Sequence, residues 1–256
     1  MGVVNVTPDS FSDGGRFFGT EAAVSHARRL ADEGADILDI GGESTRPGAA
    51  PVSEEEELRR VIPVLEALRG LGKPLSVDTH RPGVMKAALA AGASMINDIR
   101  AFAEPYSFLP LAGSGCAVCL MHMKGTPETM QREPRYDDVV AEVKAFLREA
   151  VRRASFSGIG MDRIVVDPGF GFGKTVEHNL ALLRELQQFA ELGVPVLVGL
   201  SRKSTVGRIT GRPVEERLAG SLAMALLAIQ RGAKIVRVHD VKETRDVIAV
   251  WEAVRQ

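Results

Sequence analysis

A pattern of amphipathic stretches followed by short apolar runs recurs along the chain. Residues 33–36 lead into the apolar run 37–40, residues 231–234 lead into 235–238, and a third copy spans 91–99. Each amphipathic stretch ends at a glycine, the residue that most readily adopts the left-handed conformation that stops a helix. A helix, a glycine stop and a buried strand, repeated in this order, indicate an α/β architecture.

Eight apolar runs have the length of a strand. Most are continuous Val, Ile and Leu segments, which is typical of parallel strands covered on both faces. No linker or low-complexity segment divides the 256 residues, a length that suits one barrel domain. The pattern therefore predicts a single-domain (β/α)8 TIM barrel over residues 1–256. The predicted strands are 2–6, 36–40, 75–78, 94–97, 117–121, 164–167, 196–199 and 235–238.

Two predicted helices start with a capping box, in which a polar residue is followed three positions later by a glutamate. The first pair is Ser53 and Glu56, and the second is Asp240 and Glu243. We interpret the acidic run 54–57 as a solvated helix start that interacts favourably with the helix dipole.

The charge balance limits the classes of partner. The chain has 32 basic and 33 acidic residues, a net charge of −1, so no bulk charge attracts it to nucleic acid or to an acidic membrane. No apolar run approaches the roughly 18 residues of a membrane span, and the N-terminus has no secretory pattern. We expect a cytoplasmic enzyme. Cys116 and Cys119 lie in a strand-like run and are interpreted as buried structural thiols, because residues three apart on a strand point to opposite faces.

Polar side chains lie at the C-terminal ends of most predicted strands. These ends meet at one face of a barrel, where catalytic residues are found. Burying a carboxylate or an amide unpaired costs several kcal/mol, so these groups must pair with each other, with water or with a ligand. Their convergence favours a ligand rich in hydrogen-bond donors, such as a flat heterocycle with amino and ring N–H groups. The set comprises Asn5, Asp39, Glu43, Asp78, Asn97, Asp98, Asp167, Arg237 and His239.

Basic residues gather after the last two predicted strands. Arg237 and His239 are two apart and share a strand face, and Lys203 follows strand seven. Loops after strands seven and eight of a barrel often hold phosphate, which predicts an anion site here. Arg202 is left without a role, since a surface salt bridge would explain it. The glycine-rich run 169–175 fails the phosphate-loop pattern and is interpreted as a pocket wall.

Seven segments of the chain together resemble dihydropteroate synthase. The resemblance runs from residue 2 to the C-terminus and implies a β/α barrel enzyme of folate biosynthesis. Such an enzyme is a transferase that condenses p-aminobenzoate with (7,8-dihydropterin-6-yl)methyl diphosphate, giving 7,8-dihydropteroate and pyrophosphate, and is a target of sulfonamides. The segments are NVTPDSFSDGG (5–15), DIGGESTRPGA (39–49), VDT (77–79), INDI (96–99), DPGFGFGK (167–174), SRKS (201–204) and RVHD (237–240).

The resemblance also implies a role for particular residues. For the pterin it implies Asp78, Asn97, Asp167 and Lys203, with Met121 and Gly199 lining the slot. For the pyrophosphate it implies Thr45, Arg46, Arg237 and His239, with Val238 as a further substrate contact and Asn5 as a ligand of Mg²⁺. For p-aminobenzoate it implies Pro47, Phe172, Ser201 and Lys203, with Phe11 and Asp13 on a closing loop. The catalytic groups would be Asp78, Asp167, Lys203, Arg237 and His239.

Further expectations concern assembly and alternatives. The family resemblance implies a homodimer through the C-terminal helices in 215–256, sensitivity to sulfonamides, and a short segment before the barrel that residues 1–256 lack. One alternative is a pterin-binding barrel that transfers methyl groups to a corrinoid protein. The other is a catalytically silent pterin-binding module.

Overall fold

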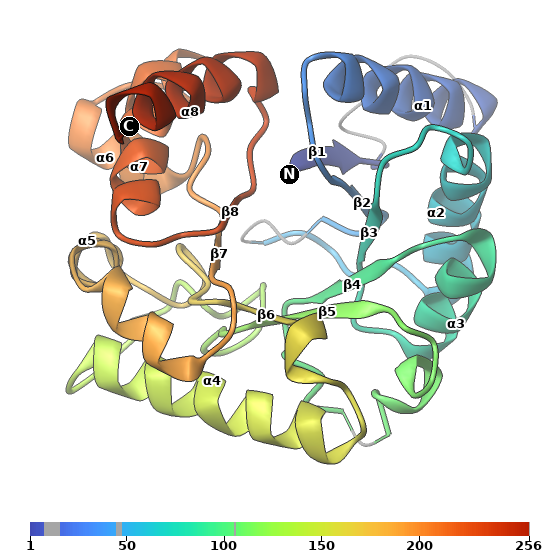
Figure 1. Ribbon diagram of the computed structural model, residues 1–256, viewed down its shortest axis with the longest axis horizontal. Helices are drawn as coiled ribbons and strands as arrows, with labels where there is room; N and C mark the ends of the chain where they lie inside the picture. The colour runs from blue at the N-terminus through green and yellow to red at the C-terminus, as the bar shows by residue number, and fades with distance from the viewer. Residues whose placement is uncertain (8–15, 45–47, 105, 256) are drawn as a thin grey trace.

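The computed structural model describes residues 1–7, 16–44, 48–104 and 106–255. In these residues parallel strands and helices alternate in chain order, and Figure 1 shows the helices arranged as a ring around the strands. Helices α1, α2 and α3 lie on one side of the ring, α4 lies below, and α5 to α8 complete the other side. This is the arrangement that the repeated pattern predicts.

Six strands form one continuous parallel sheet in the order of the chain. They are β1 (Gly2–Asn5), β2 (Leu38–Gly41), β3 (Leu75–Asp78), β4 (Met95–Asp98), β5 (Ala117–Met121) and β6 (Ile164–Asp167). The short strands β7 (Leu197–Val198) and β8 (Ile235–Val236) pair with each other, also in parallel.

Two isolated bridges join the two sheets into a closed barrel. Val166 of β6 bridges to Val196, directly before β7, and Gly2 of β1 bridges to Val238, directly after β8. Main-chain bonds support the second junction, with Val3 N–H donating to the Val238 carbonyl at 3.1 Å. The eight-stranded barrel is therefore confirmed, and each strand overlaps its predicted run.

In the described residues, α-helices and short 3₁₀ turns connect the strands: β4 and β5 are joined through a 3₁₀ turn alone, and β7 and β8 through two α-helices. None of the helices in the described part of the chain is long and apolar enough to cross a membrane. The α-helices are α1 (Arg16–Asp32), α2 (Glu54–Leu68), α3 (Pro82–Ala91), α4 (Val139–Phe156), α5 (Val176–Arg184), α6 (Ser204–Thr210), α7 (Leu218–Gln230) and α8 (Val241–Arg255). The 3₁₀ turns are η2 (Leu109–Leu111), η3 (Met161–Arg163), η4 (Leu186–Leu192) and η5 (Val214–Glu216).

The helix starts follow the predicted caps in part. The Ser53 hydroxyl accepts a hydrogen bond from Glu56 N–H at 3.2 Å, which confirms the cap of α2. At the start of α8 the Asp240 carboxylate accepts instead from the Arg202 side chain, with its Oδ2 3.0 Å from Nε. A capping box that the sequence did not predict lies at α5, where Thr175 and His178 exchange side-chain to backbone hydrogen bonds.

The core has an inner and an outer part. The inner cluster fills the barrel with Met1, directly before β1, and with one residue from each of four strands: Met95, Cys119, Val165 and Leu197. The larger outer cluster, which contains Cys116, lies between strands and helices. The two thiols thus lie on opposite sides of the barrel wall, and both are free and buried, as the sequence predicts.

The interpretation of the acidic run at α2 is wrong for one of its members. Glu57 is fully buried and pairs with Arg81, which also binds Glu43 at 2.5 Å. Burial raises the pKa of Glu57, and the hydrogen bonds to Thr79 and Arg81 oppose that shift. Glu57 therefore anchors α2 to the loop after β3, while Glu54 and Glu55 are exposed.

Candidate active site

Four polar residues, from β2, β3, β4 and the segment after β8, meet in a cluster at the mouth of the barrel. The Asp39 carboxylate on β2 is fully buried and accepts from the Ser76 hydroxyl at 2.6 Å. Its other oxygen accepts from Asn97 Nδ2 at 3.3 Å and from Arg237 Nε at 2.6 Å. The barrel thus gives Asp39 a partner from β3, from β4 and from the segment after β8.

A second carboxylate lies beside this cluster. Arg237 also donates to Asp78 Oδ2 at 3.3 Å, and Asp78 is opposite Asn97 in the register of β3 and β4. Burial, with the nearby Asp39 charge, raises the pKa of Asp78 to about 8, and Arg237 opposes the shift. Two carboxylates that share one guanidinium leave acceptor oxygens for a ligand with N–H donors.

Asp167 ends β6 and begins the glycine-rich turn. Its carboxylate accepts from Gly169 N–H at 2.7 Å, and burial raises its pKa against the opposing charge of Lys203. Gly169 has a φ of +69°, and a Cβ there would lie 1.9 Å from the His122 carbonyl oxygen. Only glycine fits this position, so the turn can fold back across the end of β5.

Lys203, directly before α6, reaches the glycine-rich turn from the segment after β7. Its ammonium donates to the Phe170 carbonyl and lies 4.6 Å from the centre of the Phe172 ring, within the range of a cation–π contact. A Cβ on Gly199 would lie 3.9 Å from both Lys203 Nζ and Arg237 Cβ, so Gly199 lies between the two cations. Burial lowers the pKa of Lys203 to about 8, and the Asp167 charge opposes this shift.

A buried lysine holds the glycine-rich turn. Lys174 Nζ is 2.9 Å from His122 Nδ1, 2.9 Å from the Gly169 carbonyl and 3.0 Å from the Phe172 carbonyl. Burial lowers the pKa of Lys174 to about 7 and that of His122 to about 3, so the neutral imidazole can accept. No role for His122 was predicted from the sequence, and here its imidazole binds the lysine that holds the turn carrying Phe172.

The end of β8 contacts the turn after β7. His239 Nδ1 is 3.0 Å from the Ser201 hydroxyl, which also accepts from His239 N–H at 3.3 Å. Val238 between Arg237 and His239 packs in the outer core, and its backbone closes the barrel against Met1 and Val3. The structure gives Val238 this structural position, and its substrate contact stays a prediction.

Asn5 and Met121 end β1 and β5 at the same face. Met121 is buried and lies beside Asp167 in the strand register, whereas Asn5 is partly exposed beside Gly41. No group of three or more His, Cys, Asp or Glu side chains that could hold a metal occurs in the described residues. The neutral amide oxygen of Asn5 fits a Mg²⁺ whose other ligands are phosphate and water oxygens, as is usual for this ion.

A cavity of about 170 Å³ opens next to Asp78 between the loops that follow β2, β3, β4 and β5. Its lining includes Ser44, His80, Arg100 and Thr126. Five predicted site residues on the first two loops lie outside the described residues. They are Phe11, Asp13, Thr45, Arg46 and Pro47.

The structure brings the other predicted residues to one face and gives contacts at the site to two residues for which the resemblance implied no role, Asp39 and Lys174. Asp39 interrupts the apolar run 37–40, and that position was the only signal of its burial in the sequence. The burial of Lys174 could not be predicted from the sequence, because a lysine after a glycine-rich segment is typical of the surface. Asp98 belongs to the loop rather than to the site, since both its oxygens accept backbone N–H groups, of Arg100 and Phe102, at 2.8 Å.

Known proteins resemble the chain over its whole length. A family model described as "Pterin binding enzyme" matches residues 1–239. The dihydropteroate synthase of Escherichia coli (strain K12) is 51% identical over 254 residues, which cover 99% of this chain and 90% of that protein. The solved structure of the Xanthomonas albilineans enzyme with 4-aminobenzoic acid is 57% identical, with a TM-score of 0.94 over 100% of this chain and 92% of that one. The Yersinia pestis enzyme in a sulfonamide complex is 48% identical, also with a TM-score of 0.94, over 100% and 93% of the two chains.

Proposed function

Because the chain belongs to the dihydropteroate synthases of the pterin binding enzyme family, we propose that the barrel mouth described above is the place where pterin and p-aminobenzoate are joined. The reaction condenses p-aminobenzoate with (7,8-dihydropterin-6-yl)methyl diphosphate, gives 7,8-dihydropteroate and pyrophosphate, and serves folate biosynthesis. The observation that carries the assignment of the site is the buried cluster of Asp39, Asp78 and Asn97 around Arg237. Burying several polar groups costs free energy, so these groups do not serve stability. A ligand with complementary hydrogen-bond donors accounts for their position in the site.

The acidic and amide side chains recognise the pterin ring. A dihydropterin presents amino and ring N–H donors in one plane, and Asp78, Asn97 and Asp167 offer the acceptors. Met121 and Gly199 form the walls of the slot, because one is apolar and the other has no side chain to obstruct the ring. Lys203 donates to the acceptors of the same ring.

The p-aminobenzoate site lies between Lys203 and the glycine-rich turn. Phe172 offers an aromatic face to the benzoate ring, while Ser201 and Lys203 offer donors to polar groups of the substrate. The resemblance adds Pro47, Phe11 and Asp13 to this site as predictions that lie outside the described residues. Sulfonamides compete for the same space, because they have the same aromatic amine and a group of similar charge distribution.

The diphosphate lies toward β1 and the loops after β2 and β8. His239 donates to its oxygens, and Arg237 supplies positive charge from the floor of the site. Thr45 and Arg46, which the resemblance adds as further donors, lie outside the described residues. Asn5 would hold a Mg²⁺, which would neutralise negative charge on the leaving group. Arginine, histidine and hydroxyl donors are suited to phosphate oxygens.

The chemical step replaces one bond by another. The lone pair of the aromatic amine forms the new C–N bond at the pterin methylene carbon, and the C–O bond to the diphosphate breaks. The electron pair leaves on the diphosphate, and the amine proton passes to water. Asp78 and Asp167 stabilise the positive charge that develops on the pterin methylene group, and the two pockets hold the reactants in contact. The neutral amine needs no strong general base.

Pyrophosphate release tests the proposed function. With both substrates and Mg²⁺, we expect release that stops when either substrate is omitted and that a sulfonamide inhibits. A protein that binds the pterin in calorimetry without releasing pyrophosphate would be the silent module. Transfer of a methyl group to a corrinoid protein would instead support the methyltransferase barrel, although the named relatives are synthases.

Two further properties belong to this proposal. We place the enzyme in the cytoplasm, because its two cysteines are free thiols and thiols stay reduced in that compartment. We also propose a homodimer through α7 and α8, which pack against each other and expose the apolar side chains of Leu227, Val250 and Val254.

A further inference from the structure

The turn after β7 contains a residue in a conformation that its side chain disfavours. Arg202 has a φ of +58°, in the left-handed region that glycine adopts without cost. A residue with a Cβ stays there only where its surroundings hold it, and such residues cluster at functional sites. Arg202 lies directly between Ser201 and Lys203, both of which belong to the proposed site.

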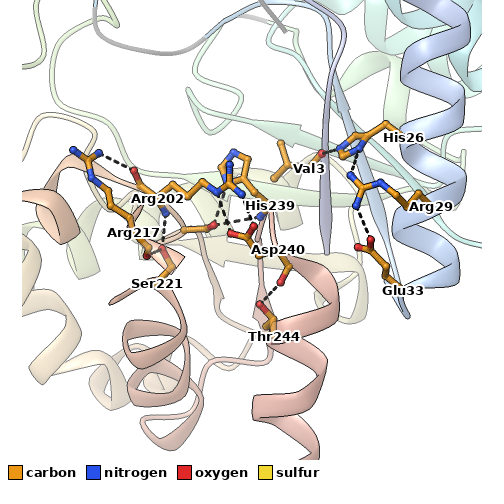
Figure 2. Close-up of polar contacts among 11 residues, drawn as sticks. Val3, His26, Arg29, Glu33, Arg202, Arg217, Ser221, His239, Asp240 and Thr244 are labelled. Atoms are coloured by element: carbon orange, nitrogen blue, oxygen red, sulfur yellow. Dashed lines mark hydrogen bonds and ion pairs between the residues drawn. The ribbon is translucent and has the colours of Figure 1, made fainter. Parts of the chain in front are cut away.

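Three contacts hold Arg202 in place, and Figure 2 shows them together. Its guanidinium binds both carboxylate oxygens of Asp240, with Nε 3.0 Å from Oδ2. Its N–H donates to the Ser221 hydroxyl at 2.9 Å, and its carbonyl accepts from the Arg217 guanidinium at 3.1 Å. The side chain is thus fixed to the end of β8, and the backbone is fixed to α7 and the residue before it.

These contacts join the β7 turn to the segment after β8 at two consecutive positions. Ser201 pairs with His239, and Arg202 pairs with Asp240. The Asp240 carbonyl in turn accepts from the Thr244 hydroxyl at 2.7 Å, which fixes Asp240 to the first turn of α8 (Figure 2). A displacement of Arg202 would therefore move the groups on both sides of it.

We propose that Arg202 is a positioning residue: its two-pronged ion pair with Asp240 holds the β7 turn so that Ser201 and Lys203 face p-aminobenzoate and His239 faces the diphosphate. The proposal rests on the functions assigned above to those three residues. It concerns the arrangement of the turn, and Arg202 itself need not touch either substrate, because its guanidinium is engaged by Asp240.

An ordinary surface ion pair would not have these features. The Arg212–Glu216 pair is a helix-spaced pair whose side chains are 64% and 55% exposed, and such pairs contribute little. Asp240 is only 16% exposed, both its oxygens are used, and the strained backbone of Arg202 depends on the contacts around it. Arg212→Met is therefore a matched control.

The test compares Arg202→Met, Asp240→Asn, their double variant and the control Arg212→Met in full-length enzyme. Measured are kcat, the KM for p-aminobenzoate, the Kd of a sulfonamide and the Tm. We expect both single variants to raise the KM and the Kd by about tenfold, because small displacements of binding groups have effects of this size. The double variant should be no worse than either single one, and Arg212→Met should match wild type.

Two further variants separate the ion pair from the backbone strain. Arg202→Gly relieves the left-handed conformation but removes the guanidinium, so its KM should rise as in Arg202→Met while its Tm stays at or above that of Arg202→Met. The exchanged pair, Arg202→Asp with Asp240→Arg, should recover part of the lost affinity. This exchange keeps the proposal testable if Arg202→Met alone folds poorly.

Three results would overturn the proposal. The first is a KM within about twofold of wild type in both single variants, even if the Tm falls. The second is an effect of Arg202→Met without an effect of Asp240→Asn, which would mean that Arg202 binds substrate directly. The third is an equal effect of Arg212→Met. If wild-type enzyme released no pyrophosphate, the proposed function itself would fail, which is a distinguishable outcome.

Discussion

Arg237 Nε lies 2.6 Å from Asp39 Oδ2, although 198 residues separate the two in the chain. Asp39 is fully buried on β2, and Arg237 follows β8, which is on the other side of β1 in the barrel. The second guanidinium nitrogen reaches Asp78 at 3.3 Å. This single cation therefore bridges Asp39 and Asp78 and fixes the geometry of the pterin side of the site.

Removing the Arg237 charge should destabilise the fold. Arg237→Met leaves the fully buried Asp39 carboxylate without its cation, and breaking a buried pair in this way costs about 3 kcal/mol of unfolding free energy. Adding Asp39→Asn should restore part of that loss, because one uncompensated charge disappears. Urea unfolding measures both, with Arg212→Met as an exposed control that changes stability by no more than about 0.5 kcal/mol. Additive losses in the double variant would contradict this role.

The Asp78 carboxyl should make stability depend on pH. Its pKa is raised from 3.8 to about 8 in the folded protein, chiefly by burial, so the folded state holds the proton over a range where the unfolded state has lost it. The stability due to this proton is fully present below the unfolded pKa and is lost as pH rises through the folded one. The Tm of wild type minus that of Asp78→Asn should therefore fall as pH rises from about 4 to about 8.

A flat Tm difference over that range, or one that rises with pH, would refute the assignment. Asp246→Asn on α8 serves as the comparison variant, because a carboxyl on an outer helix is not enclosed by the barrel.

Lys203 should set an alkaline limit on p-aminobenzoate binding. Burial lowers its pKa to about 8, so the ammonium loses its charge as pH rises through that value. We expect kcat/KM for p-aminobenzoate to fall above pH 8 in wild type. In Lys203→Met, kcat/KM for p-aminobenzoate should be low at every pH. In Lys203→Arg, which keeps its charge, kcat/KM should not fall above pH 8. Lys86→Met, exposed on α3, should behave as wild type. An unchanged alkaline fall in Lys203→Arg would assign the fall to another group.

The Asn5 amide should affect the magnesium requirement. Chelation of Mg²⁺ should abolish pyrophosphate release in every variant, because the leaving diphosphate then keeps its full charge. Asn5→Ala should raise the Mg²⁺ concentration for half-maximal rate by about tenfold, as loss of one ligand or its support commonly does. Asn5→Asp, which keeps an oxygen ligand, should stay nearer to wild type. Identical Mg²⁺ dependence in Asn5→Ala and wild type would remove Asn5 from the metal site.

Charges on the outer face of α8 should dissociate the proposed dimer. Val250 and Val254 are 66% and 81% exposed, and Val250→Glu with Val254→Glu would place two carboxylates in an apolar contact. Sedimentation velocity should then give a monomer with an unchanged fold by circular dichroism. The matched control is Phe156→Glu, which changes an 81% exposed apolar side chain on α4. A dimer that survives the valine changes would place the interface elsewhere.

The sequence predicted the barrel because strands and helices depend on patterns within a few residues. Continuous apolar runs located all eight strands, and glycine stops such as Gly92, with a φ of +106°, marked helix ends. Asp78, Asn97 and Asp167 were identifiable because each is a polar residue flush with an apolar run. Resemblance to a family named further residues, among them five on loops outside the described part of the chain.

Only the tertiary structure determined which groups are paired and which are buried. Glu57 and its exposed neighbour Glu55 are indistinguishable by local pattern, yet one is enclosed with Arg81 and the other faces solvent. The local sequence of Lys174 and Arg202 is typical of surface cations. Their partners, His122 and Asp240, lie in the segments that follow β5 and β8. The sequence by itself thus determined the order of elements and the polar positions at the strand ends. The closure of the barrel decided the electrostatics of the site, because it brings together charges that are far apart in the chain.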